Sequence, residues 1–101
     1  MKKAEFIPAA REEFLAEVAF YNASKQCLGG QFASAAEKAV ALVLAFPNIG
    51  SPGISGTLRV VIKGFPFWLV YKASSSSDII IFAIAHQSRR PGYWINRVDQ
   101  R

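Results

Sequence analysis

Three apolar stretches in the second half of the chain have the pattern of β-strands. Seven consecutive apolar residues, Ile79 to Ala85, predict a central strand covered on both faces. Before it, Thr57 to Lys63 is predicted to point Leu58, Val60 and Ile62 one way and the residues between them the other, and Phe65 to Ala73 is rich in aromatic and β-branched residues. Gly64 and the serines at 74–77 provide turns between them. The pattern predicts a three-stranded antiparallel meander.

Strict alternation along these strands predicts which side chains share a face. In the central strand one face carries Ile80, Phe82, Ile84 and His86, and the other carries Ile79, Ile81, Ala83 and Ala85. In the first strand Leu58, Val60 and Ile62 point to the core, so Arg59, Val61 and Lys63 share the opposite, positively charged face. Because helices can cover only one face of so small a sheet, we expect the C-terminal tail or a partner to cover the second apolar face.

The first half of the chain has helical spacing. Lys2 to Ile7 is expected to be an edge strand or an extended arm, because Pro8 ends it. Arg11 to Lys25 predicts a helix whose apolar face is Phe14, Val18 and Tyr21, stopped by Gly29 and Gly30. Gln31 to Phe46 predicts a second helix, and Asn48 to Gly56 an irregular loop without a phosphate-binding pattern.

These elements predict an α+β fold: an N-terminal helical hairpin packed on one face of a small, three- to four-stranded antiparallel sheet. The N-terminal segment is available as the fourth strand. Residues 1–101 are expected to form a single domain, because a chain of 101 residues supports one core.

Positive charge is concentrated in the second half of the chain. Residues 1–50 carry five basic and five acidic groups, whereas residues 51–101 carry seven basic groups and two acidic ones, so the whole net charge of +5 lies there. This asymmetry indicates an acidic partner, either nucleic acid, an acidic protein segment or a machine that handles nucleic acid.

Other features exclude several classes of protein. The start M-K-K-A-E-F-I-P lacks the apolar run of a signal peptide, and no apolar stretch approaches the roughly 20 residues of a membrane helix. We therefore expect a cytoplasmic protein without a membrane partner. Cys27 is interpreted as a small buried residue. Glu13 and Glu17 share a helix face but lack a third ligand, so they read as solvated charge, and neither a metal nor a cofactor is expected.

Candidate chemistry gathers after the central strand. His86 is the only histidine, and Arg89, Arg90, Tyr93 and Trp94 follow it. His86 is a candidate general acid or base near neutral pH, but we prefer a local hydrogen bond that fixes the turn. The arginines are candidates for pairing with carboxylates or phosphates, and the two aromatic rings for stacking on a base, filling a partner pocket or closing the core. Arg59 and Lys63 complete the candidate binding set.

Several blocks, in order along nearly the whole chain, resemble the RelE/ParE superfamily of type II toxin-antitoxin toxins, and within it the ParE-like, plasmid-stabilisation branch. They are F-I-P-A-A-R-E-E-F at 6–14, F-Y at 20–21, L-G-G-Q-F at 28–32, F-P at 46–47, F-P-F-W-L-V-Y at 65–71 and A-I-A-H-Q-S-R-R-P-G-Y-W at 83–94.

The resemblance implies a toxin neutralised by a small cognate antitoxin that wraps over the surface left open by the sheet. ParE-like members are associated with poisoning DNA gyrase, and RelE-like members with cleaving mRNA on the ribosome. The block at 89–94 has the ParE-like form, which favours a gyrase inhibitor without enzymatic activity. The alternative is a metal-independent endoribonuclease that uses Lys63, His86, Arg89 and Tyr93. A non-toxic relic that only binds its antitoxin is a third reading.

Overall fold

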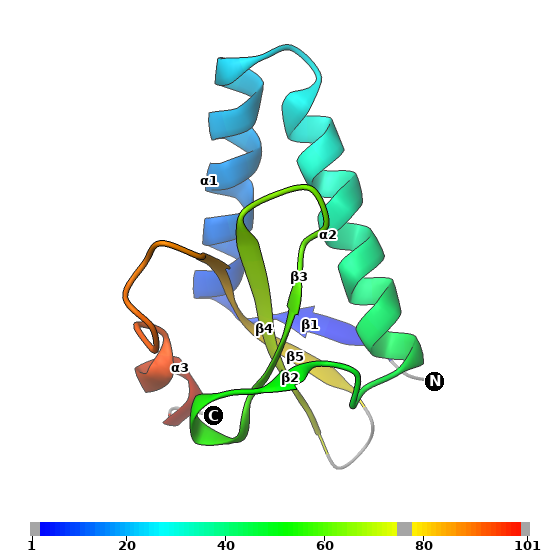
Figure 1. Ribbon diagram of the computed structural model, residues 1–101, viewed down its shortest axis with the longest axis vertical. Coiled ribbons are helices and arrows are strands. Elements are labelled where there is room, and N and C mark those ends of the chain that lie inside the picture. The colour runs from blue at the N-terminus through cyan, green and yellow to red at the C-terminus, as the bar shows by residue number, and fades with distance from the viewer. Residues whose placement is uncertain (1–2, 75–77, 100–101) are drawn as a thin grey trace.

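The computed structural model describes residues 3–74 and 78–99 and has an α+β fold (Figure 1). A helical hairpin of α1 (Pro8–Ser24) and α2 (Leu28–Ala45) lies on one face of a sheet, and its tip extends well beyond the sheet. The strands are β1 (Ala4–Phe6), β2 (Ser51–Pro52), β3 (Leu58–Val61), β4 (Phe67–Ala73) and β5 (Ile79–His86). A 3-10 turn η1 (Ile54–Gly56) and a short helix α3 (Ile95–Asp99) complete the fold. The predicted fold class is confirmed.

The sheet has five strands in the order β1-β5-β4-β3-β2, rather than three or four. β1 runs parallel to β5, and the other neighbours are antiparallel. The extra strand is β2, which lies in the segment expected to be an irregular loop. It pairs through only two residues, Ser51 with Arg59 and Pro52 with Leu58. So short a strand, with a proline in it, leaves no alternating pattern to read.

The helical hairpin turns earlier than the glycines suggested. α1 begins at Pro8, whose missing N–H costs nothing in a first turn, and ends at Ser24. Cys27 then adopts a left-handed conformation with φ of 70° and is exposed, so its interpretation as a buried residue is wrong.

Gly29 and Gly30 belong to α2 rather than stopping α1. Gly29 is buried against α1, where a Cβ atom would clash with the Asn22 side chain and the Val18 carbonyl oxygen. The Asn22 amide oxygen accepts a hydrogen bond of 2.9 Å from the Gly29 N–H, so α1 caps the first turn of α2. Glycine is needed here for close approach of the two helices.

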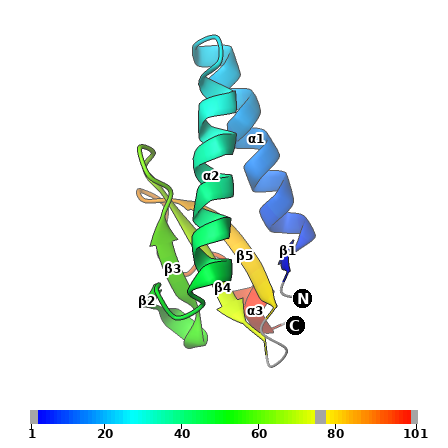
Figure 2. The same cartoon turned by 90° about the vertical axis from the view of Figure 1, so that its right-hand side faces the viewer.

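An aromatic cluster joins the hairpin to the sheet. The Phe32 ring packs on Tyr21, Phe65 and Phe67 at centroid distances of 5.3, 5.1 and 5.3 Å. This contact places Phe67, and with it the alternate β4 residues Leu69 and Tyr71, on the helical side of the sheet. Figure 2 shows α2 lying across the sheet between β3 and β5.

A β-bulge interrupts the alternation predicted for the central strand. The β4–β5 register shifts between Val70 and Tyr71, so Val70 pairs with Ala83 but Tyr71 pairs with Ile81, and Phe82 is the extra residue. Directly paired residues share a face, which puts Ile79 and Ile81 on the helical side. The remaining helix-side residues of β5 are Ile84 and His86, which pair with Leu69 and Phe67. The predicted faces are therefore wrong across Phe82.

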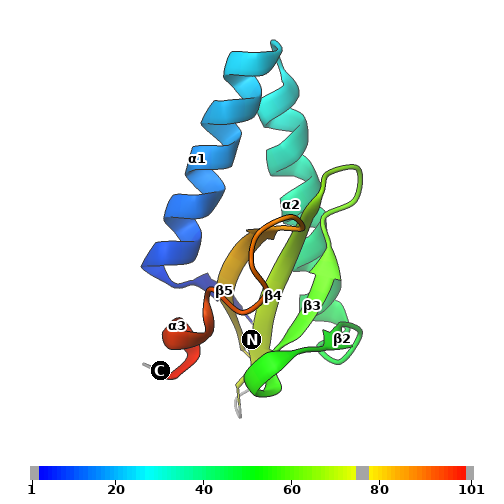
Figure 3. The same cartoon turned by 60° about the vertical axis from the view of Figure 1, so that its left-hand side comes forward.

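The C-terminal segment covers part of the second face of the sheet. We expected either this segment or a partner to cover that face. After β5 the chain crosses the sheet on the side away from α2 (Figure 3). Trp94 and Val98 are buried there, and Ala83 and Ala85 beneath are nearly inaccessible. Gly92, with φ of 78°, closes the segment against η1, because a Cβ atom there would lie 3.0 Å from Ile54 Cδ1. Among the described residues, no helix combines the length and apolar character required to cross a membrane.

Candidate functional site: a basic hollow and an open sheet edge

The carboxylate of Glu13 holds the C-terminal segment in place. Arg97 donates two hydrogen bonds to it, at 2.8 and 3.1 Å, and Tyr93 Oη donates a third at 2.6 Å. Arg89 lies 3.6 Å from the same carboxylate and stacks on the Tyr93 ring, with its guanidinium carbon 3.7 Å from the ring centroid. The interpretation of Glu13 as solvated charge is wrong, because its side chain is only 16% exposed.

The same side chains complete the outer edge of β5. β1 pairs with β5 only as far as Ile81. Beyond it, Glu13 Oε1 accepts a hydrogen bond of 3.1 Å from the Ile84 N–H, and Arg97 donates one of 3.0 Å to the Phe82 carbonyl oxygen. Tyr93 Oη also lies 3.4 Å from the Ile84 carbonyl oxygen. Side chains thus take the place of a strand partner and satisfy a backbone edge that would otherwise be unpaired.

The cluster shifts the acidity of its members. Burial, and then the hydrogen bond to and the charge of Glu13, raise the pKa of Tyr93 well above its ordinary value. Burial alone would lower the pKa of Arg97, but its hydrogen bonds and charge interactions with Glu13 and Tyr93 together outweigh burial and raise that pKa. Tyr93 is therefore a neutral hydrogen-bond donor at physiological pH, and not a base.

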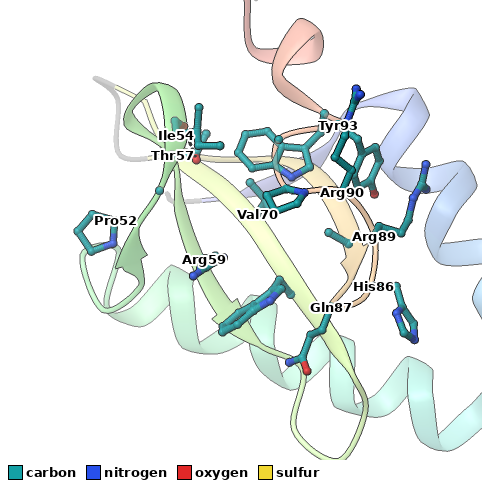
Figure 4. Close-up of a pocket in the computed structure, with 16 residues that line it drawn as sticks. Pro52, Ile54, Thr57, Arg59, Val70, His86, Gln87, Arg89, Arg90 and Tyr93 are labelled. Carbon is teal, nitrogen blue, oxygen red and sulfur yellow. Dashed lines mark hydrogen bonds between the residues drawn. The ribbon is translucent and has the colours of Figure 1, made fainter.

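A hollow of about 320 Å³ lies on the sheet face opposite α2 (Figure 4). Its floor is apolar and includes Trp68, Val70, Ala85 and Trp94. One wall is the loop from Pro52 to Thr57, and the other is the segment from Gln87 to Tyr93. Local turns fix the second wall, since the Arg89 N–H donates to the His86 carbonyl oxygen and the Gln87 N–H to the Pro66 carbonyl oxygen.

The hollow is positively charged. Arg59, Arg89 and Arg90 line it, and none of its sixteen lining residues is acidic. The Arg59 guanidinium lies over Trp68, 4.3 Å from the ring centroid, which holds the cation at the floor. Arg89 shares the charge of Glu13, but within residues 3–74 and 78–99 neither Arg59 nor Arg90 has a salt bridge. Both cations are thus available to an anion.

The structure brings together six of the seven predicted binding residues and leaves one apart. The six that line the hollow are Arg59, His86, Arg89, Arg90, Tyr93 and Trp94. Lys63 is elsewhere, because β3 ends at Val61 and the chain turns where the Ile62 N–H bonds to the Phe67 carbonyl oxygen. Lys63 therefore does not join Arg59 at the hollow and lines a different concavity.

His86 forms the local contact that we preferred for it. Its Nδ1 accepts a hydrogen bond of 3.0 Å from the Ser88 N–H, and the Ser88 hydroxyl lies 2.7 Å from the same nitrogen. The ring packs edge-on against Phe67 at 5.0 Å. In Figure 4 it points away from Arg59 and Arg90. His86 thus fixes the turn that begins the wall of the hollow.

A second concavity, which we call the α2–β3 groove, runs between α2 and the free part of β3. It has a volume of about 530 Å³, and its lining combines apolar side chains with two lysines and no acidic residue. The residues are Gln31, Ser34, Ala35, Lys38, Ala39, Leu42, Val61, Lys63 and Phe65. Leu42 and Val61 are 39% and 47% exposed, which is unusual for aliphatic side chains flanking a core.

Two residues that hold the C-terminal segment were not among the site residues predicted from the sequence. Glu13 and Arg97 organise the C-terminal segment, but they are 84 positions apart. One signal pointed to Glu13: it lies three residues after Ala10 and one before Phe14, on the stripe that α1 turns toward the core. A glutamate on such a stripe needs a partner. For metal binding, the described residues contain no cluster of three or more histidine, cysteine, aspartate or glutamate side chains.

The family follows from a sequence comparison that agrees with this architecture. A family model described as the ParE toxin of the type II toxin-antitoxin system parDE matches residues 4–91. The chain therefore belongs to the ParE toxin family of type II toxin-antitoxin systems. The match spans the hairpin, all five strands and most of the wall of the hollow. No curated protein matches the sequence.

Proposed function

We propose that this member of the ParE toxin family poisons DNA gyrase in the cytoplasm by binding to it, and that a cognate antitoxin holds it inactive. The observation that carries a binding role rather than a catalytic one is the engagement of Tyr93 and His86. Tyr93 Oη donates a hydrogen bond to Glu13, and His86 Nδ1 accepts one from the Ser88 N–H. Tyr93 is therefore not free to take a proton from a substrate, and His86 is held at the turn through Nδ1, so the pair of proton-exchanging groups that metal-independent RNA cleavage requires is not assembled around the hollow. Lys63, which the endoribonuclease reading also needs, lies outside the hollow.

The antitoxin is proposed to lay an extended segment in the α2–β3 groove. β2 pairs only with Leu58 and Arg59, so no strand in the described part of the chain covers the outer edge of β3 from Val60 onward. Because the Ile62 N–H points inward to Phe67, the N–H and C=O of Val61 point outward into the groove. An added strand would bond to Val61 through its main chain, and the exposed Leu42 side chain would receive an apolar residue.

Charge specifies the antitoxin segment further. Lys38 and Lys63 line the groove with no carboxylate beside them in the lining. An acidic segment with an apolar residue between its carboxylates would match both features of the groove. The antitoxin encoded beside the toxin gene is therefore expected to contain such a segment.

Gyrase poisoning is tested by adding the purified protein to gyrase and relaxed plasmid. We expect loss of supercoiling together with linear DNA, which marks a trapped cleavage complex, and recovery when the antitoxin is added. The double change of Arg89 and Arg90 to alanine should weaken the effect at least tenfold, whereas the same change at Arg11 and Lys25, exposed on and just after α1, should not. Unimpaired supercoiling at a large excess of folded protein would refute the gyrase target, and new transcript ends after induction would then identify an endoribonuclease.

The groove is tested separately with two substitutions of one residue. Val61→Pro removes the outward N–H without removing an internal hydrogen bond, and prolines are tolerated on edge strands. Val61→Thr keeps that N–H and nearly the same shape. We expect the proline variant to bind the antitoxin at least tenfold more weakly than the threonine variant, with equal melting temperatures. Equal affinities would exclude strand addition at β3.

A further inference from the structure

We propose that the basic hollow on the open face of the sheet is a binding site for one nucleotide of a single-stranded nucleic acid. The base would lie against the aromatic and aliphatic floor, and its phosphates would bind Arg59 and Arg90. This site is distinct from the α2–β3 groove. It does not depend on whether gyrase is the target, and binding there requires no cleavage.

The floor suits a flat, unpaired base. Trp68 is the half-buried ring of the floor, and the nearly inaccessible Trp94, Val70 and Ala85 complete it. Aromatic side chains and arginine planes are the surfaces on which proteins stack single-stranded bases without regard to sequence. A volume of about 320 Å³ is at the lower end of the roughly 300 to 1,000 Å³ typical of small-ligand sites, which suits one nucleotide and not a duplex.

The cations are arranged for phosphate. Among the residues that the structure describes, the hollow is lined by arginines and by no lysine. The planar guanidinium group of arginine binds two phosphate oxygens at once. Stacking on Trp68 holds the Arg59 guanidinium in place and leaves its N–H groups, which lie in the guanidinium plane, directed outward. Arg90 is exposed on the opposite wall. A phosphate on either side of a base on the floor would therefore have a guanidinium within reach.

An acidic peptide fits the hollow less well than a nucleotide. The floor residue Val70 is paired on both sides, with Arg59 and with Ala83, so the main chain there has no free edge on which a peptide could build. The α2–β3 groove has the reverse properties: lysines, an open edge and an exposed aliphatic lining. The two surfaces thus differ in the class of partner that they suit.

The proposal is tested by fluorescence anisotropy of the whole protein with a short, labelled oligodeoxyadenylate, over a range of salt concentrations. We expect saturable binding that Arg59→Ala and Trp68→Leu each weaken by about tenfold or more. The slope of log affinity against log salt should fall by roughly 0.7 for each arginine removed. Lys72→Ala is the matched control, because Lys72 lies on the same strand and sheet face as Trp68 but does not line the hollow.

Four results would overturn the proposal. The first is no saturable binding at low salt, and the second is an equal loss of affinity with Lys72→Ala, which would indicate diffuse attraction by net charge. The third is equal affinity for a duplex of the same length. The fourth is displacement of the oligonucleotide by an oligoglutamate peptide at a lower concentration than by unlabelled strand. The last result would assign the hollow to an acidic protein. Melting curves of every variant exclude loss of folding as the cause, and the supercoiling assay, scored separately, distinguishes failure here from failure of the gyrase proposal.

Discussion

Replacing Glu13 should release the C-terminal segment and destabilise the protein strongly. Glu13 accepts hydrogen bonds from Tyr93, from Arg97 and from the Ile84 N–H, and its side chain is 16% exposed. A hydrogen bond to a charged group contributes about 1.5 to 3 kcal/mol, and breaking a buried pair costs about 3 to 5 kcal/mol. Since the Arg97 side chain is 23% exposed and regains water, we expect Glu13→Ala to lower the free energy of unfolding by about 3 kcal/mol.

Urea denaturation measures this loss. With a slope of about 1 to 3 kcal/mol per molar urea for a small domain, the unfolding midpoint should fall by roughly 1 to 3 M. Glu12→Ala is the matched control, because it removes the same group from the adjacent position of α1, where Glu12 is exposed and has no ion pair with any residue that the structure describes. It should change stability by less than about 0.5 kcal/mol. Equal midpoints for the two variants would refute the anchoring role of Glu13.

A double-mutant cycle separates the ion pair from the rest of the cluster. Once Glu13 is alanine, Arg97 is a partly buried cation without its carboxylate, so Arg97→Leu should cost less in that background than in the wild type. The difference should be at least about 1 kcal/mol. Amide hydrogen exchange at Trp94 and Val98, buried in the wild type, shows whether the segment detaches before the rest of the fold opens. Strictly additive losses would mean that the two residues act independently.

Three further predictions concern the folded core and its pH dependence. Gly50→Ala should destabilise the protein by about 1 to 3 kcal/mol, because a Cβ atom would lie 2.8 Å from Tyr71 Oη and 3.0 Å from the β3 backbone. Gly30→Ala, where a Cβ atom would meet open space, should stabilise the protein by about 0.5 to 1 kcal/mol. Thermal melts compare the two variants. Tyr71→Phe should lower the free energy of unfolding by about 1 to 3 kcal/mol, because the buried Tyr71 hydroxyl donates to the Pro47 carbonyl oxygen at 2.8 Å and accepts from the Gly50 N–H. Tyr21→Phe loses no hydrogen bond among the described residues and should lower it by less. Burial raises the pKa of Tyr93, so its contribution is present below about pH 10 and lost as pH rises above it; alkaline urea titrations should show a steeper fall in stability for wild type than for Tyr93→Phe.

Local sequence patterns were sufficient for the elements whose partners follow closely. The stripe from Phe32 to Val43 gave α2, and the alternation of Leu58, Val60 and Ile62 gave the core face of β3, since all three turn toward the helices or lie buried. Where the pattern depended on a distant contact, it failed. Gly29 reads as a helix stop by composition, but the Asn22 side chain and the approach of α1 make it part of a helix. The bulge at Phe82 is equally invisible, since only pairing with β4 reveals it.

The candidate site was predictable as a set of residues but not as a geometry. The block from His86 to Trp94 was singled out because it breaks regular structure after a buried strand, and most of its residues line the hollow. Which residues of the block hold the structure together and which remain available to a partner could not be predicted from the block itself. Arg89 and Tyr93 turn toward Glu13, while Arg90 remains without an ion pair among the residues that the structure describes. That division is decided by a carboxylate in α1, far away in sequence.

The two edges of the sheet connect these observations. Each edge strand is short and stops beside a proline: β1 ends two residues before Pro8, and β2 itself contains Pro52. Each therefore leaves part of its neighbour uncovered. On β5 the uncovered groups at Phe82 and Ile84 are bonded by side chains of the protein itself. On β3 the outward groups of Val61 have no such cover from β2, which pairs only as far as Arg59, and exposed apolar side chains and two lysines flank them. Since an uncovered edge invites pairing with another chain, the contrast identifies β3 rather than β5 as the edge where a protein partner is expected.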